Sequence, residues 1–424
     1  MAAKLFLHAL VFFFLVAAPF LAYSEGRVFR ATMMRSEKAI NFTQAARRSQ
    51  ERLWMLSARL DAAAGGVSTQ TPLQKMDGAG EYGIAFSIGT PPQELSALAD
   101  TGSDLVWVKC GACVRCAPQG SPSYYPNTSS SFSKLPCSSG LCGDLKSKSR
   151  ATCDAGGSEC DYTYFYGLAF RSHHYTMGYL GSETFTLGSD AVPGIGFGCT
   201  TMSEGGYGTG SGLVGLGRGP LSLVKQLRVG AFSYCLTSDP SKTSPLLFGS
   251  GALTGAGVQS TPLVQGLSPT YYTVDLRSIS IGAVTTLGTR TSGIVFDSGT
   301  TLTFLAEPAY TLAKAALLSQ TNLPLAAGRG DGSDDVCFQT SGGSADVPSM
   351  VLHFDGADMA LPAENFFLPA GNGGVICWVV RRSPSRLSIV GNIMQMDYHV
   401  RYDVDNSVLS FQPANCDNLE ETGN

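Results

Sequence analysis

Short runs in which apolar and polar residues alternate dominate the chain after about residue 80. The alternation is clearest in three stretches: Glu81–Gly89, Tyr271–Gly282 and Tyr398–Phe411. A period of two residues predicts half-buried β-strands. Helix-forming residues or helical periodicity favour helices in three others: Ser36–Leu60, Pro220–Leu227 and Ala306–Leu318. We therefore expect a mainly β protein with few short helices.

Length and composition fit this expectation. The chain has 424 residues, 44% of them hydrophobic and 15% charged, and 50 of them are Gly. Glycine adopts positive φ without steric cost, so this content suits many strands joined by tight turns. A chain of this length is too long for one compact core and comfortable for two lobes.

The N-terminus predicts export. Lys4 is followed by the apolar run Leu5–Leu21, and the small residues Ala22 and Ser24 suit cleavage after Ser24. This pattern is typical of a signal peptide. A transmembrane anchor is the alternative, but it needs roughly 20 apolar residues and no cleavable end. The C-terminal residues Asn415–Asn424 are polar and show no lipid-anchor tail.

Charge is distributed unevenly between the leader and the rest of the chain. Residues 25–60 hold eight Lys and Arg against three Glu, a net charge of about +5, and residues 61–424 carry about −10. A basic segment can bind nucleic acid or a membrane, but residues 25–60 precede an acidic body in the same chain. We expect a propeptide that lies across its own acidic cleft; a helical leader without a partner is the alternative. The small and polar residues of Asp61–Gly80 predict a linker.

The twelve cysteines are an even number in a chain that is expected to meet oxidising conditions. Disulfides are therefore expected, with a connectivity that spacing alone does not fix. The close spacing of Cys110, Cys113 and Cys116 also suits a metal site. In a secreted chain we favour disulfides, and we expect no metal and no cofactor.

One pair of motifs repeats in the same order. Asp100-Thr101-Gly102-Ser103 precedes the apolar run Leu105–Val108, and Asp297-Ser298-Gly299-Thr300 precedes Leu302–Leu305. Roughly a hundred residues after each comes an apolar pair with a Gly, first Leu213-Val214-Gly215 and then Ile389-Val390-Gly391. A duplicated pair of motifs indicates two related lobes, each of which brings one Asp to a shared axis.

The residue types explain the chemistry that two such aspartates perform. Two carboxyls close together cannot both ionise, so they share one proton and titrate as a pair. The ionised one takes a proton from a water, and the protonated one donates to the scissile carbonyl. Gly102 and Gly299 leave space at the axis. Thr101 and Ser298 can hydrogen-bond between the lobes, and Ser103 and Thr300 can bond the outer carboxylate oxygens.

These motifs resemble the pepsin-type aspartic peptidases, and more closely the nepenthesin-like branch of plants. The resemblance covers nearly everything after about residue 80. It includes Asp100–Trp107, the three cysteines 110, 113 and 116, Cys160–Gly167, Phe197–Cys199, Gly212–Leu223, Phe232–Cys235, Asp297–Thr303 and Gly391-Asn392.

The resemblance implies two pseudo-symmetric β-rich lobes around a long cleft, acid endopeptidase activity and a removable propeptide. We expect a signal peptide at 1–24, a propeptide at 25–77, an N-terminal lobe at 78–241 and a C-terminal lobe at 242–424. The expected partners are protein or peptide substrates and the chain's own propeptide, with no nucleic acid and no stable membrane anchor. The expected product is a monomer that is secreted to the cell wall space, with the vacuole as the other destination.

The resemblance also assigns roles to single residues. Tyr166 matches the flap tyrosine that closes over substrate, and Trp107 matches the indole that hydrogen-bonds it. Asn127 lies in a glycosylation sequon that would survive propeptide removal; Asn41 lies in another, within the leader. The resemblance implies disulfides between residues 110–113, 116–199, 137–160, 142–153, 235–416 and 337–377.

The chain departs from the family in its flap. The family's Tyr-Gly-Asp-Gly-Ser is replaced by Tyr166-Gly167-Leu168-Ala169 and then Phe170–Tyr175, which makes the flap about four residues longer. This change bears on substrate preference and turnover, but not on the two aspartates. The alternative function is a binding protein on the same fold, such as the plant glycosidase-inhibitor relatives that have lost catalytic groups. Both Asp triplets are intact here, which favours the enzyme.

Overall fold

We analysed the protein as a computed structural model. It describes residues 28–35, 39–62, 80–111, 113, 115–116, 121–166, 174–205, 210–249, 253, 257–289, 293–326, 335–340, 346–371 and 374–418. The predicted signal peptide lies outside these residues, as does most of the predicted linker.

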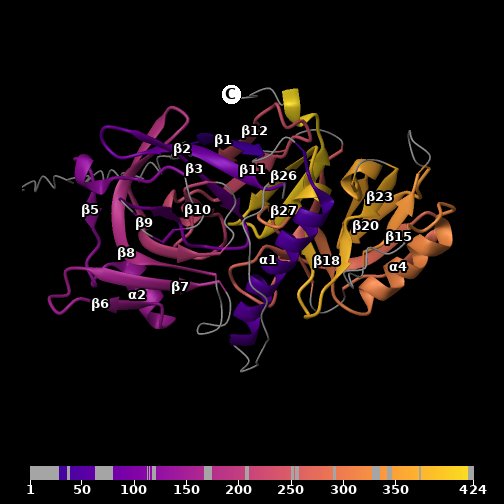
Figure 1. Ribbon diagram of the computed structural model, residues 1–424, viewed down its shortest axis with the longest axis horizontal. Helices are drawn as coiled ribbons and strands as arrows, with labels where there is room; N and C mark the ends of the chain where they lie inside the picture. The colour runs from indigo at the N-terminus through magenta and orange to yellow at the C-terminus, as the bar shows by residue number, and fades with distance from the viewer. Residues whose placement is uncertain are drawn as a thin grey trace, which may run out of the picture.

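A continuous antiparallel run of strands joins the two lobes and occupies the centre of Figure 1. Its order is β2 (Tyr82–Ile88), β1 (Phe29–Arg35), β12 (Ser244–Phe248), β11 (Ala231–Cys235), β26 (Tyr398–Asp403), β27 (Val408–Pro413) and β13 (Gln259–Val264). Strand β1 comes from the leader, for which only a helix was expected. Its alternate residues Phe29, Ala31 and Met33 are buried in the core. The leader is therefore built into the central sheet.

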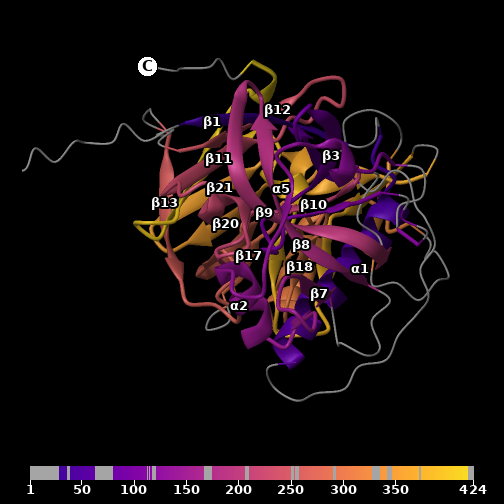
Figure 2. The same cartoon turned by 90° about the vertical axis from the view of Figure 1, so that its left-hand side faces the viewer.

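The N-terminal lobe is a strongly paired β-structure. Its further elements are β3 (Gln93–Asp100), β4 (Trp107–Lys109), η1 (Pro126–Thr128), β5 (Ser133–Lys134), α2 (Gly140–Ser147), β6 (Ala151–Cys153), β7 (Cys160–Phe165), β8 (Tyr175–Leu187), β9 (Asp190–Glu204), β10 (Gly212–Gly215) and α3 (Leu223–Gln226). Figure 2 views the molecule with this lobe in front, so that the long strands β8 and β9 stand before the strands of the other lobe.

Among its described residues, the C-terminal lobe contains two further sheets and one helix of twelve residues. One set of elements surrounds the second Asp motif: β14 (Thr273–Val274), β17 (Ile294–Phe296), β18 (Thr303–Leu305), β24 (Val380–Arg382), β25 (Ile389–Val390) and α5 (Asn392–Gln395). The others are β15 (Leu276–Ile281), β16 (Val284–Leu287), α4 (Ala309–Gln320), β19 (Cys337–Gln339), β20 (Met350–Phe354), β21 (Ala357–Leu361), η3 (Ala363–Asn365), β22 (Phe367–Pro369), β23 (Val375–Trp378) and η4 (Cys416–Asn418). The predicted class, a mainly β bilobal fold with few short helices, is confirmed.

The predicted elements correspond to observed ones, with shifted ends. The predicted helix at 306–318 is α4, and the one at 220–227 shrinks to α3, which the Ser222 side chain caps by accepting from Lys225 N. The predicted helix at 36–60 is α1 (Phe42–Ala62), so the first two residues of the predicted linker are helical. The side chain of Asn41 caps its start by accepting from Gln44 N at 3.2 Å.

Helix α1 lies between the lobes, in front of the central sheet (Figure 1). Buried positions recur every three or four residues, at Phe42, Ala45, Ser49, Arg52 and Leu56, and the buried neighbours Ala46, Arg48, Leu53, Met55 and Ser57 widen this face. This spacing gives the helix one inward face. Trp54, on the opposite face, is 44% exposed.

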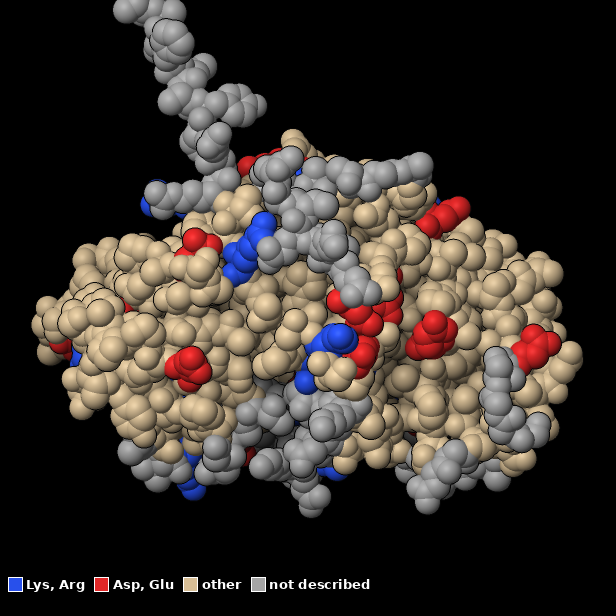
Figure 3. All heavy atoms as spheres, turned by 90° about the horizontal axis from the view of Figure 1, so that it is seen from above, with Lys and Arg blue, Asp and Glu red and all other residues tan. Residues whose placement is uncertain are grey.

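The surface mixes charges of both signs. Seen from above (Figure 3), a basic and an acidic group of side chains lie next to each other near the middle of an otherwise mostly uncharged face. Among the described residues, this face carries no extended tract of one sign. No helix in the described part of the chain is both long and apolar enough to cross a bilayer.

Candidate active site

The two aspartates occupy equivalent positions in the two lobes. Asp100 is the last residue of β3, and Asp297 directly follows β17. Each of these strands pairs in parallel with the strand of the downstream apolar motif: β3 with β10, where Gly215 aligns with Asp100, and β17 with β25. The repeat that the sequence displays is therefore one structural unit used twice. Both carboxyls are fully buried at the junction of the lobes.

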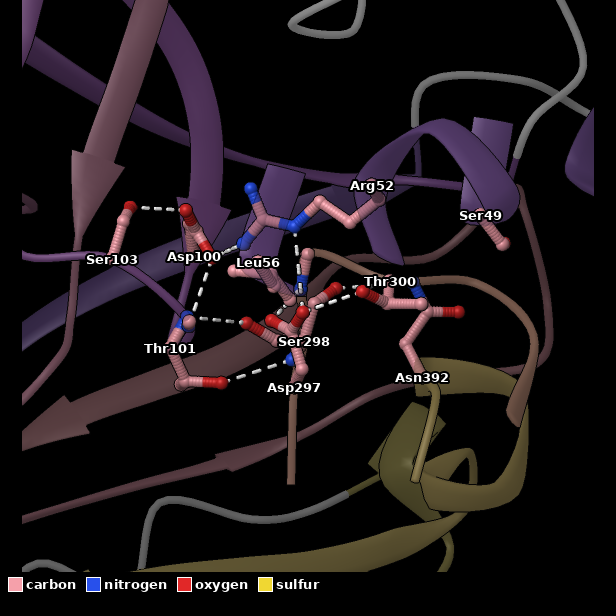
Figure 4. Close-up of polar contacts among 12 residues, drawn as sticks. Ser49, Arg52, Leu56, Asp100, Thr101, Ser103, Asp297, Ser298, Thr300 and Asn392 are labelled. Atoms are coloured by element: carbon pink, nitrogen blue, oxygen red, sulfur yellow. Dashed lines mark hydrogen bonds and ion pairs between the residues drawn. The ribbon is translucent and has the colours of Figure 1, made fainter. Parts of the chain in front are cut away.

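Thr101 and Ser298 link the two aspartate loops, as predicted. Ser298 N donates to Thr101 Oγ1 at 2.9 Å, and Thr101 N donates to Ser298 Oγ at 3.2 Å. Each hydroxyl also donates across the junction, Thr101 Oγ1 to Phe296 O at 3.1 Å and Ser298 Oγ to Ala99 O at 2.9 Å. Asn392 adds a support that the sequence reading had given no role, since its Nδ2 donates to Ser298 O at 3.1 Å. Four hydrogen bonds thus fix one loop against the other, and Figure 4 shows the two direct ones between Thr101 and Ser298.

Each carboxylate accepts from its own loop. Gly102 N donates to Asp100 Oδ1 at 2.8 Å, and Gly299 N donates to Asp297 Oδ1 at 3.0 Å. The hydroxyls of Ser103 and Thr300 donate to the other oxygen, Oδ2, of Asp100 and Asp297 respectively. The two halves of the site therefore bond their carboxylates in the same way.

The two glycines show how close the carboxyls lie. A Cβ placed on Gly102 would sit 2.9 Å from Asp297 Oδ1, and one on Gly299 would sit 2.8 Å from Asp100 Oδ1. Any side chain at either position would displace the opposite carboxyl. Glycine is needed here because of close approach across the axis.

Arg52 of α1 reaches into the site and binds both aspartates. Its Nη2 donates to Asp100 Oδ1, and its Nε donates to Asp297 Oδ2 at 3.4 Å. Burial lowers the pKa of Arg52, but the charges of Asp100 and Asp297 outweigh burial and raise it overall. The guanidinium is thus a permanent cation between two carboxylates (Figure 4). Sequence reasoning gave the leader's net charge but did not single out this residue.

Helix α1 holds this position through contacts with both halves of the molecule. Arg48 pairs with Glu81 at 3.1 Å, just before β2. On the side of the C-terminal lobe, Ser49 Oγ accepts from Leu302 N at 2.9 Å and Tyr271 Oη donates to Leu56 O at 3.1 Å. These contacts place the helix directly over the paired aspartates.

Tyr166 and Trp107 are bonded as the resemblance implied. Trp107 Nε1 donates to Tyr166 Oη at 2.8 Å, and both side chains are fully buried. They share an apolar cluster with Met55 of the leader helix. The seven flap residues that follow, 167–173, lie outside the described residues.

All twelve cysteines form disulfides, but four of the six expected pairings are wrong. The structure pairs Cys235 with Cys416 and Cys337 with Cys377, as expected. It replaces 110–113 and 116–199 by 110–199 and 113–116, and 137–160 and 142–153 by 137–153 and 142–160. In the second group the sulfurs of Cys137 and Cys142 are only 3.9 Å apart. Proximity thus allows more than one partner, and the fold selects among them.

Comparisons with known proteins agree with this geometry. The family model described as "Xylanase inhibitor N-terminal" matches residues 82–250, and "Xylanase inhibitor C-terminal" matches residues 271–413. Aspartic proteinase nepenthesin-1 of Nepenthes gracilis is 43% identical over 88% of this chain and 85% of its own length. Nepenthesin-2 of the same plant is 40% identical over the same shares.

Solved structures show the fold alone. Basic 7S globulin from soybean has a TM-score of 0.66 at 18% identity, over 93% of this chain and 100% of its own. Conglutin gamma from lupine seeds has the same TM-score and identity.

Fold, paired aspartates and relatives together define an aspartic-type endopeptidase. The chain belongs to the pepsin-type aspartic peptidases, within their nepenthesin-like plant branch.

Proposed function

We propose that the protein is the zymogen of a secreted endopeptidase that hydrolyses peptide bonds in acid through a water activated by Asp100 and Asp297. The observation that carries this proposal is the convergence of two buried carboxyls with matched partners from the two lobes. Two carboxyls at this proximity share one proton. The ionised carboxylate then accepts a proton from water, while the protonated one donates to the scissile carbonyl.

The acid dependence follows from the shared proton. Activity needs one carboxyl protonated and one ionised, so the rate falls when the pair binds a second proton or loses its last one. We expect an optimum below about pH 5, in the range where paired carboxyls titrate.

The leader acts as the inhibitor in this proposal. Helix α1 places Arg52 on both carboxylates, where a water and a substrate would bind. Arginine keeps its proton at all relevant pH values, so only protonation of the carboxyls can weaken these contacts. Acid therefore releases the helix, and cleavage between Asp61 and Gly80 removes the leader. The mature product would keep Asn127, an exposed residue in η1, as its glycosylation site.

Export is part of the same proposal. The signal-peptide pattern at residues 1–24 and six disulfides suit an oxidising route to the cell wall space or the vacuole. The product is expected to act as a monomer on protein or peptide substrates.

The test is to express the full chain with Asp100→Asn or Asp297→Asn beside the wild type. The proposal expects wild-type protein to process itself and cleave peptides in acid, and both folded variants to do neither. Asparagine keeps the size of the side chain but cannot share a titrating proton. A folded wild type without peptidase activity from pH 2 to 7 would support the binding-protein alternative instead. Near-normal activity of either variant would disprove the paired-carboxyl mechanism.

A further inference from the structure

The wall of the C-terminal lobe that faces the leader helix carries an arginine. Arg381 of β24 donates from its Nη1 to Ala46 O of α1 at 3.2 Å. One turn further along the helix, Ser49 Oγ accepts from Leu302 N at 2.9 Å. Arg381 therefore lies on the surface that the helix covers in the zymogen and that release of the leader would expose.

Arg381 is held in this position by its own lobe. Its strand, β24, pairs in parallel with β18, where Arg381 lies opposite Phe304. Its Nε forms an ion pair with Asp335 Oδ1 at 2.7 Å, and the two side chains are 12% and 16% exposed. The guanidinium is a rigid plane with donors on each of its nitrogens, so the contact at Nε sets the direction of Nη1. This direction is therefore fixed without the leader.

The leader also shows how far Arg381 lies from the reacting groups. Ala46 precedes Arg52 by six residues on α1. Near the other end of the helix, Ser57 Oγ lies 2.7 Å from Ser385 Oγ, so the helix follows the wall formed by β24 and the loop after it. A helix rises about 1.5 Å per residue, which puts Ala46 about 9 Å along the axis from Arg52, the residue that contacts both aspartates. An extended peptide advances about 3.3 Å per residue, so this distance spans about three residues of a substrate.

We propose that Arg381 binds substrate in the mature enzyme: its Nη1 donates to a main-chain carbonyl about three residues from the scissile bond, in the place that Ala46 O occupies in the zymogen. This proposal rests on the proposed function, in which the leader leaves. A partly buried donor that loses its acceptor is costly unless another acceptor replaces it. An extended peptide offers carbonyls of the same chemistry as Ala46 O. Asp335 already balances the charge of Arg381, so a neutral carbonyl suits this donor better than a second anion.

The experiment measures how kcat/KM depends on peptide length, in acid-processed enzyme made from the full chain. A peptide with one cleaved bond is extended by one alanine at a time, at either end, with both ends blocked. Each alanine adds a main-chain carbonyl and no side-chain acceptor. In the wild type we expect kcat/KM to rise about tenfold at the alanine that supplies the carbonyl, the ratio that one hydrogen bond from a charged group provides. The rise should come mainly from a lower KM.

Arg381→Ala should lose this step and keep the gains at the other end of the peptide. Arg386→Ala is the matched control, because Arg386 is an exposed arginine on the loop that follows β24. R386A should keep the step. Arg381→Lys provides a second variant if R381A does not fold. Lysine keeps the charge opposite Asp335 but has a single nitrogen, so it cannot bond Asp335 and a carbonyl from separate atoms; R381K should match the wild type in thermal unfolding and still lose most of the step.

The same length step in the wild type and in folded R381A or R381K, in an enzyme that D297N inactivates, would overturn this proposal alone. The absence of any such step in the active wild type would do the same. A step that appears with glutamate at that position and not with alanine would also overturn it, because the ligand of Arg381 would then be a side-chain carboxylate. A wild type without acid peptidase activity would overturn the proposed function, and this proposal with it.

Discussion

Arg52 is the side chain through which the leader contacts both aspartates, so Arg52→Ala is the sharpest test of how the zymogen is held. The guanidinium side chain is 5% exposed, and both of its carboxylate partners are fully buried. Truncation leaves two carboxylates under the helix without their cation. We expect the leader to bind much more weakly in this variant and to leave at a higher pH.

The size of the effect follows from burial. Removing one member of a buried ion pair costs about 3–5 kcal/mol, because the remaining charge is left unpaired. That loss corresponds to a factor of about 10² to several times 10³ in the dissociation constant of the leader. If release takes up the one proton that the active pair shares, each pH unit offsets about 1.4 kcal/mol. The midpoint of release should therefore rise by about two to three and a half pH units.

The control is Arg47→Ala on the same helix. Arg47 is 41% exposed and pairs with Glu51 one turn away at 3.3 Å. Such exposed pairs contribute about 0.3–0.5 kcal/mol, so the midpoint of R47A should stay near that of the wild type. Burial, the largest influence, raises the pKa of Glu51. A carboxyl with a raised pKa takes up its proton more readily in the folded zymogen than in the released leader, so Glu51 is not the group whose protonation frees the helix.

The assay follows the full-length zymogen from pH 7 to pH 3. Gel bands report the loss of the leader, and a quenched fluorescent peptide reports the opening of the site. Arg52→Lys should release at an intermediate pH, since lysine keeps the charge but lacks the planar fork that reaches two carboxylates. Equal midpoints for R52A, R47A and the wild type would mean that the apolar face of α1 holds the leader and that Arg52 does not.

Three further results are expected. Gly299→Ala should lower kcat at least about a hundredfold in a folded protein, because the new Cβ lies 2.8 Å from Asp100 Oδ1 and displaces a reacting group; a kcat near that of the wild type would contradict the close approach. Burial, and after it the charge of Arg401, lowers the pKa of His399 to about 4. Between pH 6.5 and pH 4 only the unfolded chain binds a proton at this imidazole, so the free energy of unfolding of the wild type should fall by up to about 3 kcal/mol as the pH falls through that range. The free energy of unfolding of His399→Gln, measured by thermal unfolding, should fall less over that range. An equal fall in both proteins would show that the imidazole is already charged in the folded state. Peptide mapping without reduction should recover Cys110 linked to Cys199, and a fragment linking 110 to 113 would refute that pairing.

The positions of Asp100 and Asp297 could be predicted because the motif around each is local and occurs twice. In each motif the Asp provides the carboxylate, the next residue provides a hydroxyl that bonds to the other loop, and the Gly donates its N–H to the carboxylate and leaves room for the opposite one. The strand alternation likewise predicted the β class, since side chains on a strand alternate between core and solvent within a few residues. Strand β1 shows the limit of that reading. Its alternation is present in Phe29–Arg35, which precedes the predicted helix at 36–60 and for which no strand was predicted.

Contacts between residues far apart in the chain could not be predicted from the sequence. Arg52 is one of eight basic residues in the leader, and it lies 48 and 245 positions from its two partners. Only the docking of α1 distinguishes it from the exposed Arg47. The disulfides among Cys137, Cys142, Cys153 and Cys160 were mispaired for a related reason: several sulfurs lie close together, and the path of the chain decides which of them meet.

By itself, the sequence determined the class of the fold, the duplicated aspartate units and the sign of the leader's charge, because these properties depend on neighbouring residues or on sums over a segment. The tertiary structure alone decided which arginine meets the aspartates and which cysteines pair. Those choices depend on side chains that converge from separate strands and helices, and a hydrogen bond or disulfide forms only within a few ångströms.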